Sequence, residues 1–236
     1  MPGFIIDMDG TLYSGKHPVP GASEFVARLR KKGWPFLFLT NNASKNPQQV
    51  ADHLRAITGI PAESREVLTS GVAAARYMVE QNRGKRVMCI GESGLVEALE
   101  EAGLELVEEE RPDYVVQGID RNFTYRKLEL AVRHIRAGAV FIQTNPDHLL
   151  PTENGPIPSA GSIAAAITTA AETEPVLIGK PSPIITRYAI EQIGLEPSDI
   201  WVIGDNIRTD IGGGIAAGCK TALSLTGLAT PDNYEE

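Results

Sequence analysis

The residues with the clearest chemical potential stand at positions 7–11, Asp-Met-Asp-Gly-Thr, directly after a short apolar stretch. Asp7 and Asp9 are two residues apart, so their side chains point the same way in an extended segment. Paired carboxylates can bind a divalent cation, attack an electrophilic centre or exchange a proton. Gly10 permits a tight turn, and Thr11 can hydrogen-bond to nearby backbone. Taken alone, the same residues also fit an ordinary Asp-Gly turn with a capping threonine.

Two further apolar stretches end in polar residues. The first leads into Thr40, Asn41 and Asn42, and the second leads through Gly204 into Asp205. In an open α/β sheet, ligands bind beyond the carboxyl ends of the strands, where the strand order reverses. We therefore expect these two segments and residues 7–11 to meet in one crevice.

The elements that must position these residues form a regular pattern. Short apolar runs alternate with amphipathic stretches of helical periodicity, which is typical of a mostly parallel sheet with helices on both faces. We expect a doubly wound, Rossmann-like α/β fold, with the first helices over residues 22–32 and 47–57. The expected strands cover residues 4–6, 35–39, 67–69, 87–90, 114–116, 140–142, 176–178, 200–203 and 222–225.

Composition excludes several classes of protein. The 236 residues are 42% apolar and 22% charged, which argues against whole-chain disorder. The net charge of −8 argues against binding to a nucleic-acid polymer. No apolar run reaches the roughly 20 residues of a membrane-spanning helix, and no signal-peptide pattern is present. Cys89 and Cys219 are too few for a disulfide framework, so we expect a reduced, cytoplasmic setting without membrane partners.

Four separated blocks give the chain a specific resemblance. They look like the motifs of the haloacid dehalogenase (HAD) superfamily of phosphohydrolases, and their order and spacing are similar to the NagD-like phosphatases. The four blocks are residues 7–11, 40–42, 179–181 and 204–206 with 209–210, and the NagD-like features extend over residues 39–42, 144–147, 179–183 and 204–210.

The resemblance implies a role for each acidic residue. Asp7 would be the nucleophile, and Asp9 would protonate the leaving oxygen and then act as base toward water. The metal ligands would be Asp7, Asp205 and the backbone carbonyl of Asp9, with Asp210 acting through water. Physical chemistry agrees, because two unit charges about 4 Å apart repel by about 4 kcal/mol at an effective dielectric constant of 20. A divalent cation, Mg²⁺ by its preference for oxygen ligands, would remove that repulsion.

The second and third blocks carry the groups that would bind phosphate. Thr40, Asn41 and Asn42 resemble the phosphate-binding block, although a Thr-Asn-Asn sequence also fits an ordinary strand-to-loop turn. Lys180 resembles the cation that offsets the charge of Asp7 and the phosphate. A lysine at a helix start is disfavoured by the helix dipole, which favours a functional reason for its presence.

The resemblance also implies two domains. We expect a HAD-like core of residues 1–82 and 175–236, with a smaller α/β cap of residues 83–174 inserted between the second and third blocks. Asn145 and Asp147 follow an apolar run inside that segment, and they are our candidates for contacting the leaving group, together with the loop of residues 151–161.

The expected function is a magnesium-dependent phosphatase that hydrolyses small phosphomonoesters through an aspartyl phosphate. Sugar phosphates and nucleoside monophosphates are both open as substrates, with aryl phosphates as surrogates and a small phosphorylated metabolite as the partner. A homodimer is left open as well. The alternatives are a regulatory protein that binds a phosphorylated metabolite with vestigial hydrolysis, and a dehalogenase. The acid Asp9 argues against both, because neither needs a group that protonates a leaving oxygen.

Overall fold

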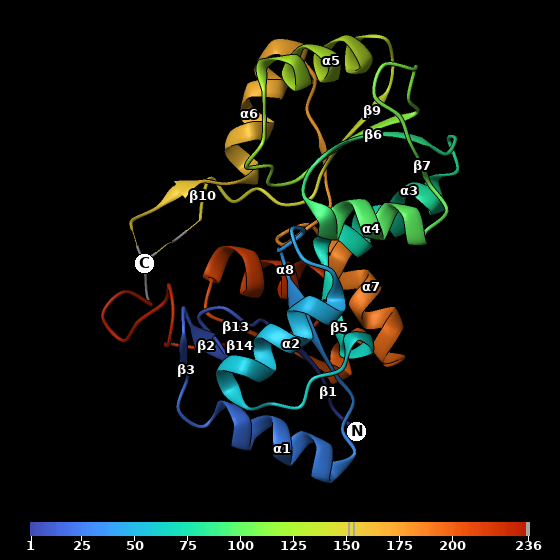
Figure 1. Ribbon diagram of the computed structural model, residues 1–236. Coiled ribbons are helices and arrows are strands. Elements are labelled where there is room, and N and C mark those ends of the chain that lie inside the picture. The colour runs from blue at the N-terminus through green and yellow to red at the C-terminus, as the bar shows by residue number, and fades with distance from the viewer. Residues whose placement is uncertain (151, 153, 235–236) are drawn as a thin grey trace. The chain divides into compact units, whose positions relative to one another are not determined.

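The computed structural model describes residues 1–150, 152 and 154–234 (Figure 1). Positions 151 and 153 of the predicted leaving-group loop lie outside the described residues. The chain divides into two compact units. Unit 1 comprises residues 1–40, 47–68 and 180–236, and unit 2 comprises residues 41–46 and 69–179.

Unit 1 is built on a five-stranded sheet with the order β14-β13-β1-β4-β5. Strand β1 pairs in parallel with β13 on one side and with β4 on the other, and β13 pairs in parallel with the edge strand β14. The strands are β1 (Gly3–Ile6), β4 (Phe36–Thr40), β5 (Val67–Thr69), β13 (Ile200–Gly204) and β14 (Lys220–Leu223).

Helices cover the sheet of unit 1. Phe4, Ile6 and Phe38 share one buried cluster with the apolar residues of α1 (Ala22–Lys32) and α2 (Pro47–Thr58). Helix α7 (Pro183–Ile193) begins with the N-cap Ser182 and a proline in its first turn, a combination that favours helix initiation. The remaining elements of unit 1 are β2 (Tyr13–Ser14), β3 (His17–Pro18), η1 (Ser64–Glu66), α7 (Pro183–Ile193), η2 (Pro197–Asp199), the π-helical turn η3 (Ile207–Ile211) and α8 (Gly212–Ala216).

Unit 2 contains a second five-stranded sheet, with the order β12-β9-β8-β6-β7 and every neighbouring pair parallel. Its strands are β6 (Arg86–Ile90), β7 (Glu105–Leu106), β8 (Tyr114–Gln117), β9 (Val140–Gln143) and β12 (Val176–Leu177). A short antiparallel pair, β10 (Leu149–Leu150) and β11 (Ile157–Pro158), lies outside this sheet.

Four helices flank the sheet of unit 2. In Figure 1, α5 (Tyr125–Arg136) lies beside α6 (Ala160–Ala171), and α3 (Ser70–Gln81) lies beside α4 (Ser93–Glu101). Apolar residues of α5 and α6 form one core with Met88, Val115 and Phe141 of the sheet. Within the described residues, no helix combines the length and the apolar character needed to span a membrane.

The predicted fold class is confirmed, since parallel sheets with flanking helices make up both units. All nine predicted strands are present, although the last covers Lys220–Leu223 instead of residues 222–225. Unit 2, of residues 41–46 and 69–179, contains the whole segment 83–174 that is expected to form the cap, and the cap itself stays a prediction. Unit 2 therefore includes α3, and it takes up nearly half of the chain.

Candidate active site

The polar ends of two neighbouring strands in unit 1 lie side by side. Asp7 follows β1 and Asp205 follows β13, and the two strands pair through Ile6 and Ile203. The backbone N–H of Asp7 donates a hydrogen bond of 2.8 Å to the carbonyl oxygen of Ile203. Strand β1 lies between β4, the next strand of this sheet along the chain, and β13, which comes much later in the chain. The strand order therefore reverses at β1, and the carboxyl ends of β1 and β13 form a switch point of the sheet.

Three carboxylates gather at this switch point. One oxygen from each of Asp7, Asp205 and Asp210 lies within 4.8 Å of the others, and we call these residues the acidic cluster. The ammonium Nζ of Lys180 lies 2.5 Å from Oδ1 of Asp7 and 2.6 Å from Oδ1 of Asp210. The side chains of Asp7, Asp210 and Lys180 are 13%, 2% and 6% exposed. The structure thus brings residues of three predicted blocks into one buried centre.

The acidic cluster carries more negative than positive charge, because it sets three carboxylates against one ammonium. Burial raises the pKa of Asp7 to about 7; Lys180 opposes this shift, and Asp210 and Asp205 add to it. Burial lowers the pKa of Lys180, but Asp210 and Asp7 outweigh it and raise the pKa overall. The site therefore favours a charged lysine and an additional cation.

Glycine allows the backbone to approach the cluster closely. Gly10 has a φ of +87°, in the left-handed region, and a Cβ there would collide with the carboxylate of Asp205. A Cβ on Gly204 would collide with the carboxylate of Asp210. Both positions need glycine for steric reasons, and Gly10 also needs it for its backbone conformation.

Asp9 stands outside the acidic cluster. Its side chain is exposed, and its backbone forms an isolated bridge with Tyr13. Partial desolvation raises the pKa of Asp9, and hydrogen bonds from the backbone of Gly15 and Gly10 oppose this shift. An exposed carboxyl with a raised pKa is suited to exchanging a proton with a bound ligand.

The predicted phosphate-binding residues are divided between the two units. Thr40 ends β4 in unit 1, whereas Asn41 and Asn42 begin the first segment of unit 2. Oδ1 of Asn42 accepts hydrogen bonds from the backbone N–H groups of Ser44 and Lys45, at 2.8 and 3.3 Å. That carbonyl oxygen therefore stabilises a turn.

The predicted leaving-group residues lie close to Asn41 within unit 2. Nδ2 of Asn145 donates to the carbonyl oxygen of Asn41 at 2.9 Å, and Oδ1 of Asn145 accepts from the N–H of Asp147 at 3.1 Å. Asn145 is buried, at 5% exposure, while Asp147 is half-buried. Nδ2 of Asn41 donates to Oδ2 of Asp147 at 3.4 Å. Asn145 thus links two backbone segments, which sequence reasoning did not foresee.

Comparison with known proteins identifies the family. A family model for haloacid dehalogenase-like hydrolases matches residues 4–105, and a HAD-hydrolase-like model matches residues 177–236. An acid sugar phosphatase of Staphylococcus aureus is 43% identical over 232 residues, covering 98% of this chain and 89% of the relative.

This chain belongs to the HAD-like hydrolases.

Solved structures place this HAD hydrolase in the NagD-like branch of phosphatases. It superposes on NagD from Escherichia coli K-12 with a TM-score of 0.93 and 32% identity, covering 100% of this chain and 92% of NagD. It superposes equally well on a p-nitrophenyl phosphatase from Archaeoglobus fulgidus, with a TM-score of 0.93, 36% identity and coverage of 99% and 90%. The predicted resemblance is confirmed, and the protein is an enzyme.

A divalent cation fits the acidic cluster of this HAD hydrolase. Oδ1 of Asp7 accepts a hydrogen bond from Lys180, and Oδ2 of Asp205 accepts one from the N–H of Leu228. Within the described residues, the second carboxylate oxygen of each accepts no hydrogen bond from another residue. Asp210 uses both, since Oδ1 accepts from Lys180 and Oδ2 accepts from the N–H of Asn206. Oxygen donors and excess negative charge suit Mg²⁺. Asp7 and Asp205 therefore have more capacity for direct ligation than Asp210.

A segment after β14 contacts the same cluster, and sequence reasoning missed it. The N–H of Leu228 donates to Oδ2 of Asp205 at 2.6 Å, and the hydroxyl of Thr226 donates to the carbonyl oxygen of Gly10 at 2.7 Å. A Cβ on Gly227 would collide with the carboxylate of Asp205. The segment thereby fixes the orientation of Asp205. Its signal was available, because Thr226 and Gly227 follow an apolar strand just as the recognised polar residues do.

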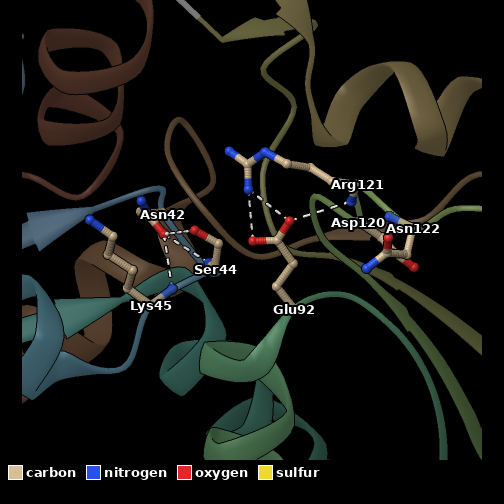
Figure 2. A network of polar contacts seen from close by, with 7 residues as sticks. All are labelled: Asn42, Ser44, Lys45, Glu92, Asp120, Arg121 and Asn122. Atoms are coloured by element: carbon tan, nitrogen blue, oxygen red, sulfur yellow. Dashed lines mark hydrogen bonds and ion pairs between the residues drawn. The ribbon is translucent and has the colours of Figure 1, made fainter. Parts of the chain in front are cut away.

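The carboxyl ends of β6 and β8 in unit 2 carry a further polar network (Figure 2). Nη1 of Arg121 donates to both carboxylate oxygens of Glu92, at 2.7 and 2.8 Å. Asp120 is buried and pairs with Nζ of Lys127 at 2.6 Å. These contacts connect the loop after β6 with the loop after β8, and the sequence patterns gave no indication of them.

Proposed function

We propose that this protein is a magnesium-dependent phosphatase that hydrolyses small phosphomonoesters through an aspartyl phosphate. The observation that carries the proposal is the acidic cluster with Lys180 at the switch point of the unit 1 sheet. A buried carboxylate beside a buried ammonium suits attack on an anionic phosphoryl group, because the ammonium offsets part of the charge that builds up there.

The chemistry takes two steps. In the first, a carboxylate oxygen of Asp7 forms a bond to phosphorus, the bond from phosphorus to the leaving oxygen breaks, and Asp9 donates a proton to that oxygen. In the second, Asp9 accepts a proton from water, the water oxygen bonds to phosphorus, and the bond to Asp7 breaks. Lys180 stabilises the negative charge during both steps, and Thr40 and Asn41 are the proposed donors to the phosphoryl oxygens.

The metal would be held by Asp7, Asp205 and the backbone carbonyl of Asp9, with Asp210 acting through water. When bound, Mg²⁺ supplies positive charge that reduces the repulsion between the carboxylates and the phosphate. The hydrogen bonds of Asp210 to Lys180 and Asn206 support the less direct role for this residue.

The names of relatives support the substrate class. The curated relative from Staphylococcus aureus is an acid sugar phosphatase, and the neighbour from Archaeoglobus fulgidus is a p-nitrophenyl phosphatase. We infer that sugar phosphates are substrates and that aryl phosphates serve as surrogates, with nucleoside monophosphates as the competing class. A cap domain of residues 83–174, a cytoplasmic location and a homodimer remain predictions.

Metal removal tests this function directly. We expect exhaustive chelation to abolish hydrolysis of a panel of sugar phosphates, nucleoside monophosphates and p-nitrophenyl phosphate, because the excess negative charge of the acidic cluster would then face the phosphate unscreened. Mg²⁺ should restore the activity, whereas Ca²⁺, which prefers larger and more flexible coordination, should restore less. The measurement is kcat/KM for each substrate before chelation, after it, and after readdition.

Two outcomes would count against the proposal. Undiminished hydrolysis after chelation would exclude the metal-dependent scheme. Tight binding of a phosphomonoester without turnover in the presence of Mg²⁺ would favour the alternative, a regulatory protein that binds a phosphorylated metabolite.

A second prediction concerns specificity. We expect Asp147→Ala to change the ranking of natural phosphomonoesters, because a half-buried carboxylate can accept hydrogen bonds from substrate hydroxyls worth about 1–3 kcal/mol each. Activity toward p-nitrophenyl phosphate, which has no hydroxyl groups, should fall much less. The buried Asn145 bonds to backbone, so Asn145→Ala is the matched comparison and should lower all rates together. A uniform drop in both variants would remove Asp147 from substrate selection.

A further inference from the structure

A recess of about 280 Å³ lies at the amino ends of three neighbouring strands in unit 2. Arg86 begins β6, Arg111 and Asp113 stand just before β8, and Gly138 stands just before β9. Arg83, from the loop before β6, also lines the recess. The recess is at the opposite edge of this sheet from Glu92, Asp120 and Asn145, which follow the carboxyl ends of the same strands.

The three arginine side chains that line the recess have hydrogen-bonding capacity to spare. Within the described part of the chain, none of them lies within ion-pair distance of a carboxylate. Nη2 of Arg111 donates to the carbonyl oxygen of Ala137 at 3.1 Å, and no other contact of these three guanidinium groups is found there. All three residues are exposed, so their N–H groups can reach a ligand that enters from solvent.

The carboxylate in the lining contacts backbone and, within the described residues, forms no ion pair with the three arginines. Oδ2 of Asp113 accepts a hydrogen bond of 2.9 Å from the backbone N–H of Arg86. A Cβ on Gly84, whose φ is +138°, would collide with the same carboxylate, so Asp113 is packed against backbone. Asp113 thus holds the strand ends together, and the recess keeps three positive charges against one negative charge.

Nearby acidic residues also leave the recess positive. Glu109 pairs with Arg126 at 2.7 Å, and Glu105 stands opposite Arg86 in the register of β7 without forming an ion pair. A simpler account is that arginines stabilise helix C-termini through the helix dipole. That account explains Arg111, which contacts the end of α5, but it leaves Arg83 and Arg86 unexplained in a chain of net charge −8.

We propose that this recess binds a compact phosphate anion of the pyrophosphate class, held by the guanidinium groups of Arg83, Arg86 and Arg111. The planar fork of N–H donors on a guanidinium matches the oxygens of a phosphate group. The volume of about 280 Å³ lies just below the range of about 300–1,000 Å³ for pockets that enclose drug-sized ligands, which suits a compact anion. The proposal is independent of the proposed hydrolysis, because it concerns a separate set of residues.

The test is a titration of the full-length protein with inorganic pyrophosphate, followed by ¹H–¹⁵N NMR spectroscopy in the presence of a chelator. Without a divalent cation, the acidic cluster repels anions and does not compete for the probe. We expect saturable chemical-shift changes centred on the amides of Gly84, Arg86 and Gly138. A parallel titration with ADP shows whether the anion can carry a nucleoside, and one with inorganic phosphate shows whether a single phosphate is enough.

Charge-matched variants make the assignment specific. Combined Arg83→Gln, Arg86→Gln and Arg111→Gln should weaken pyrophosphate binding by at least about tenfold. Combined Arg28→Gln, Lys31→Gln and Lys32→Gln on α1 removes the same charge from unit 1 and should leave binding unchanged. Equal weakening in both variants, or wild-type shifts that avoid the recess, would overturn the proposal. If the variant without the three arginines fails to fold, the positions of the chemical-shift changes in the wild-type protein alone show whether pyrophosphate binds at the recess.

Discussion

Replacing Asp7 by asparagine is expected to lower kcat by at least about 10⁴-fold toward every phosphomonoester. An amide cannot form the acyl phosphate on which both steps depend, and the neighbouring Asp9 is assigned to proton transfer instead. The fold should persist, because the substitution removes one of three clustered negative charges while Lys180 keeps its 2.6 Å contact with Asp210. The measurement combines steady-state kinetics with a urea unfolding curve.

The matched control for this prediction is Asp52→Asn. Asp52 is an exposed carboxylate of α2, 54% exposed, and it takes no part in the proposed chemistry. Its replacement should leave both kcat and the unfolding midpoint nearly unchanged. Turnover retained by Asp7→Asn, with contaminating phosphatases excluded, would contradict the role of Asp7 as nucleophile.

Replacing Lys180 by methionine should damage both stability and catalysis. Methionine retains much of the side-chain bulk but removes the ammonium that contacts both Asp7 and Asp210. Breaking a buried ion pair from one side typically costs about 3–5 kcal/mol, so we expect a loss of about 3 kcal/mol in the free energy of unfolding without divalent cations. We also expect kcat to fall by at least about 10²-fold, because the charge at the phosphoryl group is no longer offset.

A double variant separates the two effects. Asp210→Asn combined with Lys180→Met removes one negative charge together with the ammonium, so much of the lost stability should return while activity stays low. Recovery of activity in the double variant would show that Lys180 acts only through folding. Full stability in the single variant would mean that the ion pairs contribute little to holding unit 1 together.

Much of the fold could be predicted from the sequence because its strands are short, apolar and buried. The stretch Phe4–Ile6 gives a clear signal, since residues of a covered parallel strand face helices on both sides. The helix Ser70–Gln81 is harder to assign to a unit. Its buried residues include Ser70, Gly71 and three consecutive alanines, a composition that does not indicate which sheet the helix covers. The helix falls in unit 2, together with the segment 83–174 that is expected to form the cap.

The sequence was sufficient to predict the charged residues of the site that directly follow a strand, such as Asp7 and Asp205. It was less informative for polar side chains that form hydrogen bonds with the backbone. Asn145 has the residue type of a substrate-binding group, but its amide connects the backbone of Asn41 and Asp147. Only three-dimensional contacts between distant segments reveal such a role, and the contact of Leu228 with Asp205 is a second example.

If Asp7 is the nucleophile, it carries the phosphoryl group during turnover, and this covalent intermediate can be trapped. In Asp9→Asn, an activated aryl phosphate should still phosphorylate Asp7, because its leaving group needs no proton, while hydrolysis of the intermediate slows for want of a base. Acid quenching during turnover, followed by peptide mass spectrometry, should find one hydroxylamine-sensitive phosphoryl group on Asp7. Continued turnover with no phosphoryl group on Asp7 at any quench time would exclude Asp7 as the nucleophile.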